Sequence, residues 1–585
     1  MGITDILSLI GGLVLFLYGM DLMGDSLKKL AGGKLESILA RLTSSRWKGF
    51  LLGLVVTAVI QSSSATTVML VGFVNSGIMN LGQTISIIMG ANIGTTVTSW
   101  LLSTADIKGT AAILNLFKPS TFTPILAIVG LLMTMTAKKD SKKNTGFILI
   151  GFAILMFGMD KMSGAVEGLE GNDTFTGMLT MFSNPIMGIL VGTIFTAIIQ
   201  SSSASVGVLQ ALALSCVIPY QTAIPVILGQ NIGTTITPII SSISGNTDSK
   251  RVAFTCLSIK MVGVVVVCGI FYILNAIFPF GFMTQRIGVM EIAVVHTLFN
   301  ILSTIILIPF CSLFEKLAVK VIKGKSEAET DEFSMLDDRF LEMPGFAVEK
   351  SKELVYEMAN ITKGAFLRAT KLMDEFSEEE FKAVEELEGR VDRYEDKLST
   401  YLIRIAATQV SQKDSKTVTE LLHCIGDIER ISDHAFNIAK VAKEINDKDI
   451  SFSNHATKDL KVMQRAVSDI LDLTVGALSE DNIEIAKLVE PLEQVIDRLK
   501  RKIKAGHIDR LRQGDCTIEL GFILSDLLTN YERISDHCSN IAVCVIEISH
   551  DTFETHEYLN NLKSGDVEEF GKMYQSYKEK YSLEQ

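Results

Sequence analysis

The first half of this 585-residue chain has few charged residues, and the cysteines of the whole chain form no recognisable motif. Only 17 of its 54 Lys and Arg and 12 of its 66 Asp and Glu lie in residues 1–310. None of its eight cysteines forms a Cys-x-x-Cys pair, which indicates reduced structural thiols. The chain also lacks a phosphate-binding P-loop, a His-Glu-x-x-His motif and a credible catalytic triad. We therefore predict that it is not an enzyme and does not use ATP.

The distribution of charge divides the chain into two halves. The first is apolar and slightly basic, whereas positions 311–585 carry 37 basic and 54 acidic side chains. This contrast is typical of a membrane domain followed by a soluble domain. We predict a membrane domain at 1–315, a linker at 316–340, a soluble domain at 341–552 and a charged tail at 553–585, to which we assign no role.

Three motifs in the membrane half recur at one constant spacing, the one that separates Gln61 from Gln200. Chance does not plausibly give three matches in one register, so the domain contains two repeats, at about 5–104 and about 145–243. The motif pairs are Gly19-Met20-Asp21 with Gly158-Met159-Asp160, Gln61-Ser62-Ser63-Ser64-Ala65 with Gln200-Ser201-Ser202-Ser203-Ala204, and Asn92-Ile93-Gly94-Thr95-Thr96 with Asn231-Ile232-Gly233-Thr234-Thr235.

Apolar runs give the expected membrane topology. Candidate spans lie at 6–22, 82–104, 121–137, 146–162, 221–242, 253–278 and 288–311. Two further runs, at 49–78 and 186–215, are interrupted by Gln-Ser-Ser-Ser, so we expect re-entrant hairpins or broken helices there.

Charge between the equivalent spans indicates that the repeats are inverted. The segment 24–48 contains six Lys and Arg, including Lys34 and Arg41. Its counterpart at 163–188 contains no Lys or Arg, and its charged side chains are Glu167, Glu170 and Asp173. The positive-inside rule places the two segments on opposite sides of the membrane and the C-terminal half in the cytoplasm. Inverted repeats with discontinuous helices are typical of secondary transporters, whose substrate binds near the midplane.

The Gln-Ser-Ser-Ser motifs place hydroxyl groups and freed backbone groups deep in apolar segments. Ser hydroxyls and N–H groups at a helix N-terminus suit an oxyanion, and hydroxyl oxygens and freed carbonyls suit sodium. Alternatively, the small serines only let helices pack closely. Neither motif core contains Lys or Arg, so a divalent oxyanion needs a co-bound cation, although a neutral solute also fits.

These paired motifs resemble the type II sodium/phosphate cotransporter family, in its bacterial branch, over roughly residues 5–312. The resemblance implies sodium-dependent phosphate symport, with both Gln-Ser-Ser-Ser regions forming the substrate and sodium site. The first motif continues Ala65-Thr66-Thr67, whereas the second continues Ala204-Ser205-Val206 and has one hydroxyl fewer, so the two halves need not do the same work. The candidate binding residues are Gln61, Ser62, Ser63, Ser64, Thr66, Asn92, Thr95, Thr96, Gln200, Ser201, Ser202, Ser203, Asn231, Thr234 and Thr235.

Several other ionisable residues lie in or near spans. Asp21 and Asp160 fit interfacial carboxylates as well as an ion-coupling role. Lys260, Glu291 and His296 are functional candidates by position, and a histidine satisfied by a neighbouring helix explains His296 equally well.

The soluble half has a repeat of its own. Helix formers with apolar residues at three- and four-residue spacing predict an all-helical bundle. Glu429-Arg430-Ile431-Ser432-Asp433-His434 recurs further along the chain as Glu532-Arg533-Ile534-Ser535-Asp536-His537. Each copy places two carboxylates four residues apart on one helix face, where either a metal ion or neighbouring basic side chains would neutralise them.

This half resembles the PhoU-like family of phosphate-signalling proteins over roughly 345–550. The resemblance implies a tandem pair of three-helix bundles that bind divalent or iron-type metal ions. Asp396 extends the first set of carboxylates, but its counterpart is Arg501, so the two sets differ. The implied ligands are Glu388, Asp392, Glu429, Asp433, Glu493, Asp497, Glu532 and Asp536.

Together these patterns predict an all-α protein that carries phosphate with sodium across the bacterial cytoplasmic membrane by alternating access and is regulated by its PhoU-like domain. The alternatives are a phosphate sensor without transport, or a transporter of another oxyanion or a neutral solute. We expect phosphate and the lipid bilayer as partners and no nucleic acid, and we leave open a homo-oligomer and a cytoplasmic signalling partner.

Overall fold

The computed structural model of the chain describes residues 3–31, 45–106, 119–167, 183–215, 218–324, 332–514, 516–550 and 568–583. These residues are organised almost entirely as helices, with one isolated bridge between Pro219 and Arg286, which confirms the all-α prediction. They fall into two compact units, Met1–Phe346 and Ala347–Gln585. The seven cysteines in the described residues are unpaired, as expected.

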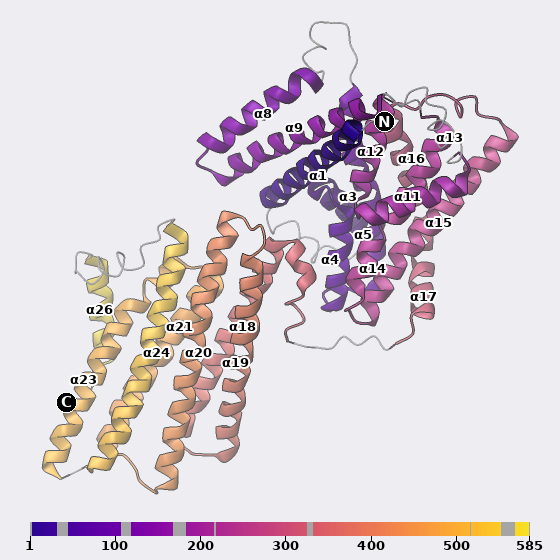
Figure 1. Ribbon diagram of the computed structural model, residues 1–585. Helices are drawn as coiled ribbons and strands as arrows, with labels where there is room; N and C mark the ends of the chain where they lie inside the picture. Colours follow the sequence, from indigo (N-terminus) through magenta and orange to yellow (C-terminus); the bar gives the residue numbers. More distant parts are fainter. Residues whose placement is uncertain are drawn as a thin grey trace. The chain divides into compact units, whose positions relative to one another are not determined.

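The first unit consists of helices of very unequal length (Figure 1). Its helices are α1 (Ile3–Ala31), α3 (Arg46–Ile60), α4 (Ser63–Asn75), α5 (Leu81–Gly94), α6 (Thr96–Ser103), α8 (Pro119–Thr136), α9 (Asp140–Val166), α11 (Pro185–Ile199), α12 (Ser202–Ser215), α13 (Tyr220–Gly233), α14 (Ile236–Ser242), α15 (Thr247–Ile277), α16 (Val289–Leu307) and α17 (Cys311–Val321), with short 3-10 turns at Thr104–Asp106, Ile308–Phe310 and Asp338–Glu342.

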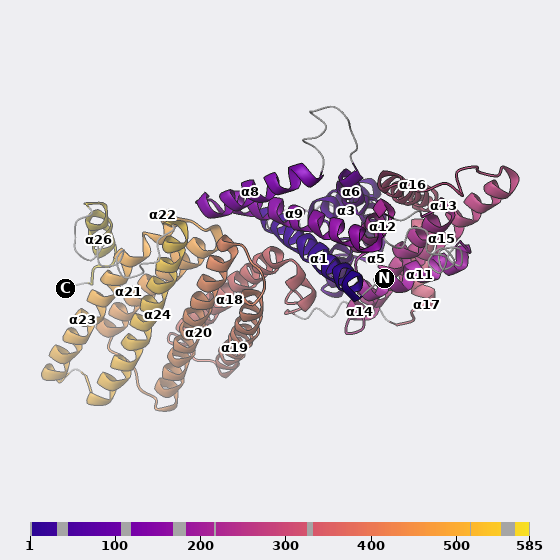
Figure 2. The same cartoon turned by 45° about the horizontal axis from the view of Figure 1, so that its top comes forward.

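Six helical segments in the described part of this unit are long and apolar enough to cross a bilayer. They are Ile3–Leu30, Leu81–Ser103, Asp140–Val166, Tyr220–Ser242, Thr247–Ile277 and Val289–Val321, and each coincides with one of the expected spans. The remaining expected span, 121–137, is the shorter apolar helix Thr121–Thr136 within α8. This helix lies beside α9 in both views (Figures 1 and 2).

The two repeats have the same order of elements. Helices α3, α4, α5 and α6 of the first correspond to α11, α12, α13 and α14 of the second, and α3 packs on α5 as α11 packs on α13. Glycine permits both contacts, because a Cβ at Gly90 would overlap the Phe50 carbonyl oxygen and one at Gly229 would overlap that of Ile189. The duplication is therefore structural, and the opposite orientation of the two copies stays a prediction.

The second unit is a set of long helices that run along one another. They are α18 (Pro344–Leu372), which begins at the end of the first unit, α19 (Glu378–Ala406), α20 (Gln412–Asp447), α21 (Asn454–Glu480), α22 (Ile483–Ala486), α23 (Val489–Gln513), α24 (Ile518–His550) and α26 (Glu568–Lys580). Helices α20 and α24, which carry the duplicated acidic motif, pack directly on each other.

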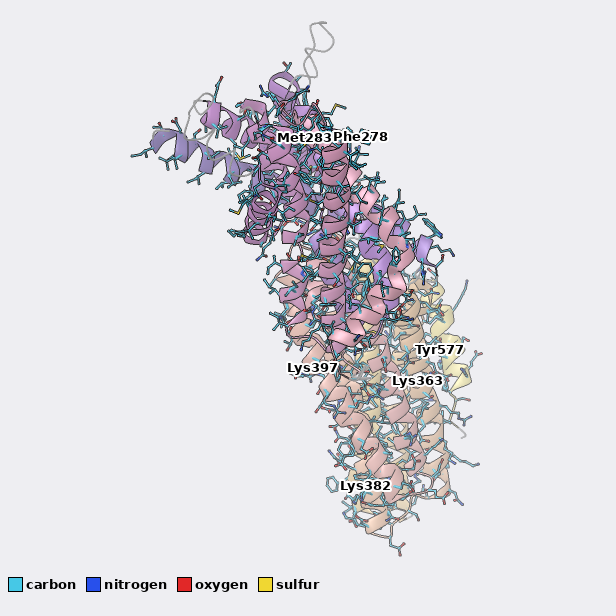
Figure 3. The ribbon with its side chains drawn as sticks, turned by 90° about the vertical axis from the view of Figure 1, so that its right-hand side faces the viewer. Phe278, Met283, Lys363, Lys382, Lys397 and Tyr577 are labelled. Atoms are coloured by element: carbon cyan, nitrogen blue, oxygen red, sulfur yellow. The ribbon has the colours of Figure 1, made fainter. Side chains whose placement is uncertain are left out.

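Amphipathic patterning explains this bundle. Tyr394 and Tyr531 are completely buried between its helices, whereas lysine side chains such as Lys363, Lys382 and Lys397 project from it (Figure 3). Figure 3 also shows Phe278 and Met283 together where α15 ends.

Parts of some sequence predictions lie outside the described residues. These are 325–331 of the expected linker, 553–567 of the charged tail, and Lys34, Arg41, Glu170 and Asp173 of the charge argument. The described part of the interval 316–340 contains the end of α17 and residues that pack on the first unit, and the domain bounds stay predictions.

Replacing Gly90 with Val should destabilise the first unit, because the added methyl groups cannot fit against α3. We expect the melting temperature of the purified protein to fall by about 5 °C or more. The matched control is Gly164→Val in α9, where no described atom outside the adjoining turns of its own helix lies within 4 Å of the added Cβ. Equal melting temperatures for the two variants would contradict the proposed packing.

Candidate functional site

Both Gln-Ser-Ser-Ser motifs break a helix at the glutamine. Gln61 ends α3 with φ 60° and ψ 21°, and Gln200 ends α11 with φ 62° and ψ 15°. In each case the glutamine N–H donates to a threonine carbonyl of the preceding turn, at 2.8 Å and 2.7 Å. Left-handed backbone at a residue other than glycine is uncommon and costs on the order of 1 kcal/mol or more, so its recurrence at equivalent positions indicates a functional constraint. The expected helix breaks are present.

The first serine of each motif caps the next helix. The Ala65 N–H donates to Ser62 Oγ at 3.1 Å, and the Ala204 N–H donates to Ser201 Oγ at 3.2 Å. These two oxygens therefore satisfy backbone donors that α4 and α12 would otherwise leave unpaired. Ser63 and Ser202 directly follow the capping serines and are buried. Their hydroxyls have no capping role, and they are the first such hydroxyls after each helix break.

Most other candidate side chains donate to backbone carbonyls three or four residues earlier in the chain. In the threonines, such donation uses the hydroxyl proton and leaves the oxygen lone pairs as acceptors. The residues that donate in this way are Thr66, Thr95, Thr96, Asn231, Thr234 and Thr235. Asn92 is partly exposed on α5.

The two repeats meet through a small set of polar contacts. Thr98 Oγ1 donates to Gln61 Oε1 at 2.7 Å, and Ser203 Oγ of the other repeat donates to Thr98 Oγ1 at 3.3 Å. Ser64 Oγ donates to the Gln200 carbonyl at 3.3 Å. The structure thus brings both motifs into one polar site. Sequence reasoning missed Thr98, although the constant spacing of the repeats pairs it with Thr237.

The two halves of this site have different environments. Gln61 is buried, with 9% of its surface exposed, whereas Gln200 is exposed and lines a cavity of about 600 Å³. Thr237 also lines the cavity, and its Oγ1 is buried without a hydrogen-bond partner among the described residues. The glutamine of the first repeat is therefore enclosed, whereas the equivalent glutamine of the second repeat is accessible.

Residues 332–346 form the outer wall of this cavity. Asp337 accepts a hydrogen bond from Asn75 Nδ2 of α4 at 2.8 Å and pairs with Arg339 at 2.7 Å. Arg339 Nε in turn donates to the Ser241 carbonyl of α14 at 3.0 Å. This 332–346 segment therefore ties the helix after the first Gln-Ser-Ser-Ser to the last helix of the second repeat.

Aromatic packing holds the 332–346 segment in place. The Phe340 ring lies 5.4 Å from that of Phe73 and 4.9 Å from that of Phe346. Phe340 is completely buried, and a Cβ at Gly72 would lie only 2.8 Å from its ring. The absence of a side chain at this position thus makes room for the segment.

The remaining ionisable candidates of the membrane unit divide by exposure. Asp21 and Asp160 are exposed, which fits the interfacial interpretation, and Glu291 is exposed as well. His296 is completely buried, and its Nδ1 lies 2.9 Å from Ser99 Oγ.

Three carboxylates of the first acidic set gather in the bundle. Oxygen atoms of Glu388, Asp392 and Asp433 lie within 4.8 Å of one another. Partial burial, followed by repulsion from Asp433 and Asp392, raises the pKa of Glu429 to about 7, and similar causes raise the pKa values of Glu388 and Asp433. Carboxylates that repel one another at this spacing suit a hard cation.

Basic side chains reach the second acidic set. Lys500 pairs with Glu532 at 2.8 Å, Arg501 approaches Asp497 at 3.9 Å, and Arg533 approaches Asp536 at 3.7 Å. Arg501 occupies the position in the second set that Asp396 occupies in the first. Basic side chains therefore take part in neutralising the carboxylates of the second set. Metal ligation by either set stays a prediction.

The two duplicated histidines face each other across α20 and α24. The rings of His434 and His537 stack with centroids 5.8 Å apart. His537 Nδ1 lies 2.7 Å from Asp427 Oδ1, and His434 Nδ1 lies 2.8 Å from Asn530 Oδ1. Sequence reasoning did not find that these two rings meet.

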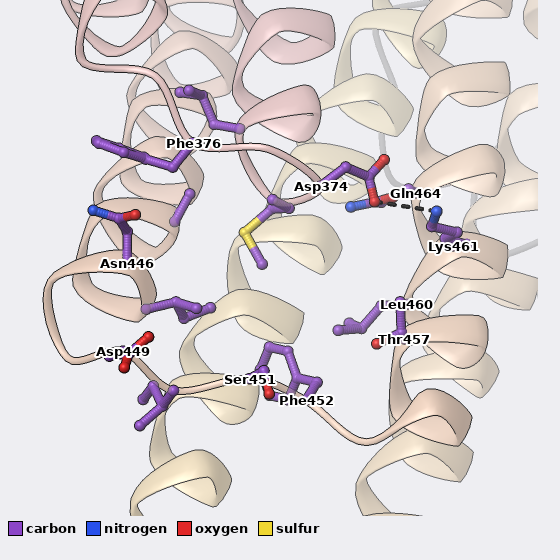
Figure 4. A pocket seen from close by; sticks show the side chains of 15 residues that line it. Asp374, Phe376, Asn446, Asp449, Ser451, Phe452, Thr457, Leu460, Lys461 and Gln464 are labelled. Carbon is purple, nitrogen blue, oxygen red and sulfur yellow. Dashed lines mark ion pairs between the residues drawn. The ribbon is translucent and has the colours of Figure 1, made fainter.

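The bundle also contains a cavity of about 400 Å³ (Figure 4). It lies between the end of α18, the end of α20 and the start of α21, and Phe376, Asp449 and Phe452 line it. An ion pair of 3.1 Å between Asp374 and Lys461 lies at its edge.

Comparison with known proteins agrees with this architecture. Residues 15–164 and 154–292 match the family described as Na+/Pi-cotransporter, and residues 355–442 and 460–545 match the PhoU domain. The first unit, with its apolar helices and duplicated broken-helix site, is the membrane part of an integral membrane transporter. Residues 15–292 of the chain are thus a Na+/Pi-cotransporter domain, and two PhoU domains follow this membrane half.

Individual relatives cover different parts of the chain. The "Putative inorganic phosphate export protein YjbB" of Salmonella typhimurium is 22% identical over 94% of this chain and 99% of its own. The "Sodium-dependent phosphate transport protein 2A" of Rattus norvegicus is 36% identical over 16% of this chain and 15% of its own. The crystal structure of PhoU from Pseudomonas aeruginosa is 19% identical and covers 35% of this chain and 97% of its own, with a TM-score of 0.33.

The raised pKa of Glu429 makes a prediction about pH. Because the folded metal-free bundle holds this proton more tightly than the unfolded chain, its stability should fall as the pH rises from about 4.5 to about 7. Glu429→Gln should remove part of that fall, while Glu386→Gln on the exposed surface of α19 should leave it unchanged. Hydrogen exchange of α20 in metal-free protein at pH 5 and pH 8 measures the effect. Equal pH dependence in the two variants would contradict it.

Proposed function

We propose that this chain carries inorganic phosphate together with sodium across the bacterial cytoplasmic membrane by alternating access. The observation that best supports this is the unequal exposure of two equivalent glutamines, Gln61 and Gln200, that border one polar site. A duplicated site that is closed on one side and open on the other is what a transporter halted in one state of its cycle requires.

The chemistry of the site fits both cargoes. The N-termini of α4 and α12 offer backbone N–H groups and the hydroxyls of Ser63 and Ser202 to an oxyanion. The Thr237 hydroxyl and the freed carbonyls at the helix breaks offer oxygen atoms to sodium. Family membership and the names of the relatives favour phosphate over another oxyanion or a neutral solute.

A symporter works in either direction, according to its gradients. One relative is named for export and another for sodium-dependent transport. We propose that the repeats are inverted in the membrane, that the soluble unit lies in the cytoplasm, and that the accessible cavity beside Gln200 faces the same side as that unit. The covalent link supports this, because the 332–346 segment, which walls the cavity, leads directly into α18.

The same link provides a route for regulation. Movement of α18 would pull on Asp337 and Arg339, which join α4 to α14. We propose that the bundle restrains the transporter through this segment, and that divalent or iron-type ions at Glu388, Asp392, Glu429 and Asp433 set the position of the bundle helices.

Purified protein in proteoliposomes tests the function. We expect labelled phosphate to accumulate with an inward sodium gradient and not with an equal potassium gradient. Folded protein that binds phosphate but moves none under either gradient would favour a sensor, and movement of another solute alone would correct the substrate.

Variants at the serines separate binding from folding. We expect Ser63→Ala combined with Ser202→Ala to lower sodium-driven phosphate flux at least about ten-fold without lowering the melting temperature. Ser62→Ala should instead lower stability by about 1 kcal/mol, because it removes the cap of α4. Full flux in the double variant would contradict the assigned role of these hydroxyls.

Release of the 332–346 segment should raise flux. Arg339→Ala removes the tie between Asp337 and the Ser241 carbonyl, so we expect an increase of about three-fold or more. Lys323→Ala, at an exposed position before the segment, serves as the control. Unchanged or lower flux in Arg339→Ala would show that the segment does not restrain transport.

A further inference from the structure

One basic side chain of the membrane unit lies deep within a spanning helix. Lys260 is 6% exposed and lies near the middle of α15, about 20 Å from its start and about 25 Å from its end at 1.5 Å per residue. Neither end is within reach of a lysine side chain, so the ammonium does not reach water by extending along the helix. Buried charges in membrane helices are costly and usually have a function.

Lys260 lies on the inward face of α15. Its neighbours Cys256, Ile259 and Gly263 on the same face are buried, whereas Met261 and Val262 on the opposite face are 45% and 37% exposed. Helix α15 packs on α4 and α5 of the first repeat and on α16. The side chain therefore points into the protein and away from lipid.

Among the described residues Lys260 has no ion pair with a carboxylate. The Cys256 thiol lies one turn away on the same face of α15. Another buried basic residue of this helix, Arg251, pairs with Asp248 at 2.6 Å near the start of α15. Lys260 thus differs from Arg251 in that its neighbours do not neutralise a positive charge.

Contacts lead from His296, whose imidazole is within electrostatic range of Lys260, to the substrate site. His296 Nδ1 lies 2.9 Å from Ser99 Oγ, and Ser99 follows Thr98, which joins Gln61 to Ser203. His296 Nε2 is buried without a partner among the described residues, as is the Oε1 atom of Gln210, whose Nε2 donates to the Ser99 carbonyl at 3.0 Å.

The depth of Lys260 along α15 matches the depth of the first serine motif along α4. Ser249 Oγ donates to the Val71 carbonyl at 3.2 Å, which fixes the start of α15 beside the end of α4. Lys260 lies about 16 Å further along α15, and Ser63 lies about 12 Å back along α4. Both residues are therefore near the level at which α3 and α4 separate.

We propose that Lys260 is a charge-compensating residue of the substrate site, with its ammonium stabilising the phosphate anion that the site receives. This inference rests on the proposed phosphate transport. It answers the shortage of positive charge in the two motifs, because a fixed cation held on α15 offsets part of the cost of bringing an oxyanion into a low-dielectric interior.

Phosphate binding by the purified full-length protein in sodium tests this proposal. We expect Lys260→Met to weaken phosphate affinity at least ten-fold and to abolish most of the rise in melting temperature that saturating phosphate causes. Its melting temperature without phosphate should equal or exceed that of the parent, since a buried charge is removed. Lys260→Arg should restore part of the affinity.

Lys250→Met, at the exposed start of the same helix, is the matched control and should bind phosphate as the parent does. Parent-like affinity in Lys260→Met would overturn the role of Lys260 and leave phosphate transport intact. A parent protein that binds no phosphate would overturn both. Equal loss in Lys260→Met and Lys260→Arg, with a lowered melting temperature in each, would make Lys260 a structural residue.

Discussion

Every backbone polar group at membrane depth must find a partner, and this requirement controls the arrangement of the whole membrane unit. A helix that stops inside the bilayer leaves N–H groups and carbonyls unpaired. Here Gln61 and Gln200 end one helix in a left-handed conformation, and Ser62 and Ser201 cap the next. The breaks are therefore tolerated at low cost, and in the proposed function the groups beyond the caps bind the cargo at the junction of the repeats.

Duplication makes the asymmetry of the site informative. If the two repeats were in identical environments, Thr98 and Thr237 would make the same contacts. Instead Thr98 joins Gln61 to Ser203, while Thr237 faces a cavity with its hydroxyl unpartnered among the described residues. An exchange of these environments between the repeats would close one side of the site and open the other, which is the change that alternating access requires.

The sequence predicted much of this architecture but few of the contacts between distant residues. The constant spacing between the paired motifs predicted both breaks, and amphipathic spacing predicted the bundle, because both depend on local pattern. Thr98 could not be found in this way, since its partners lie 37 and 105 residues away. The polar composition before Phe340 predicted a linker. In the structure Phe340 packs on Phe73, and this contact depends on the space left by Gly72.

Accessibility of the two glutamine positions tests the central claim most directly. In a cysteine-free background, Gln61→Cys and Gln200→Cys would be labelled with a membrane-impermeant thiol reagent from each side of sealed vesicles. The account predicts labelling of the two positions from opposite faces, with sodium and phosphate changing the two rates in opposite directions. Labelling of both positions from the same face would contradict a single site that is opened alternately by two inverted repeats.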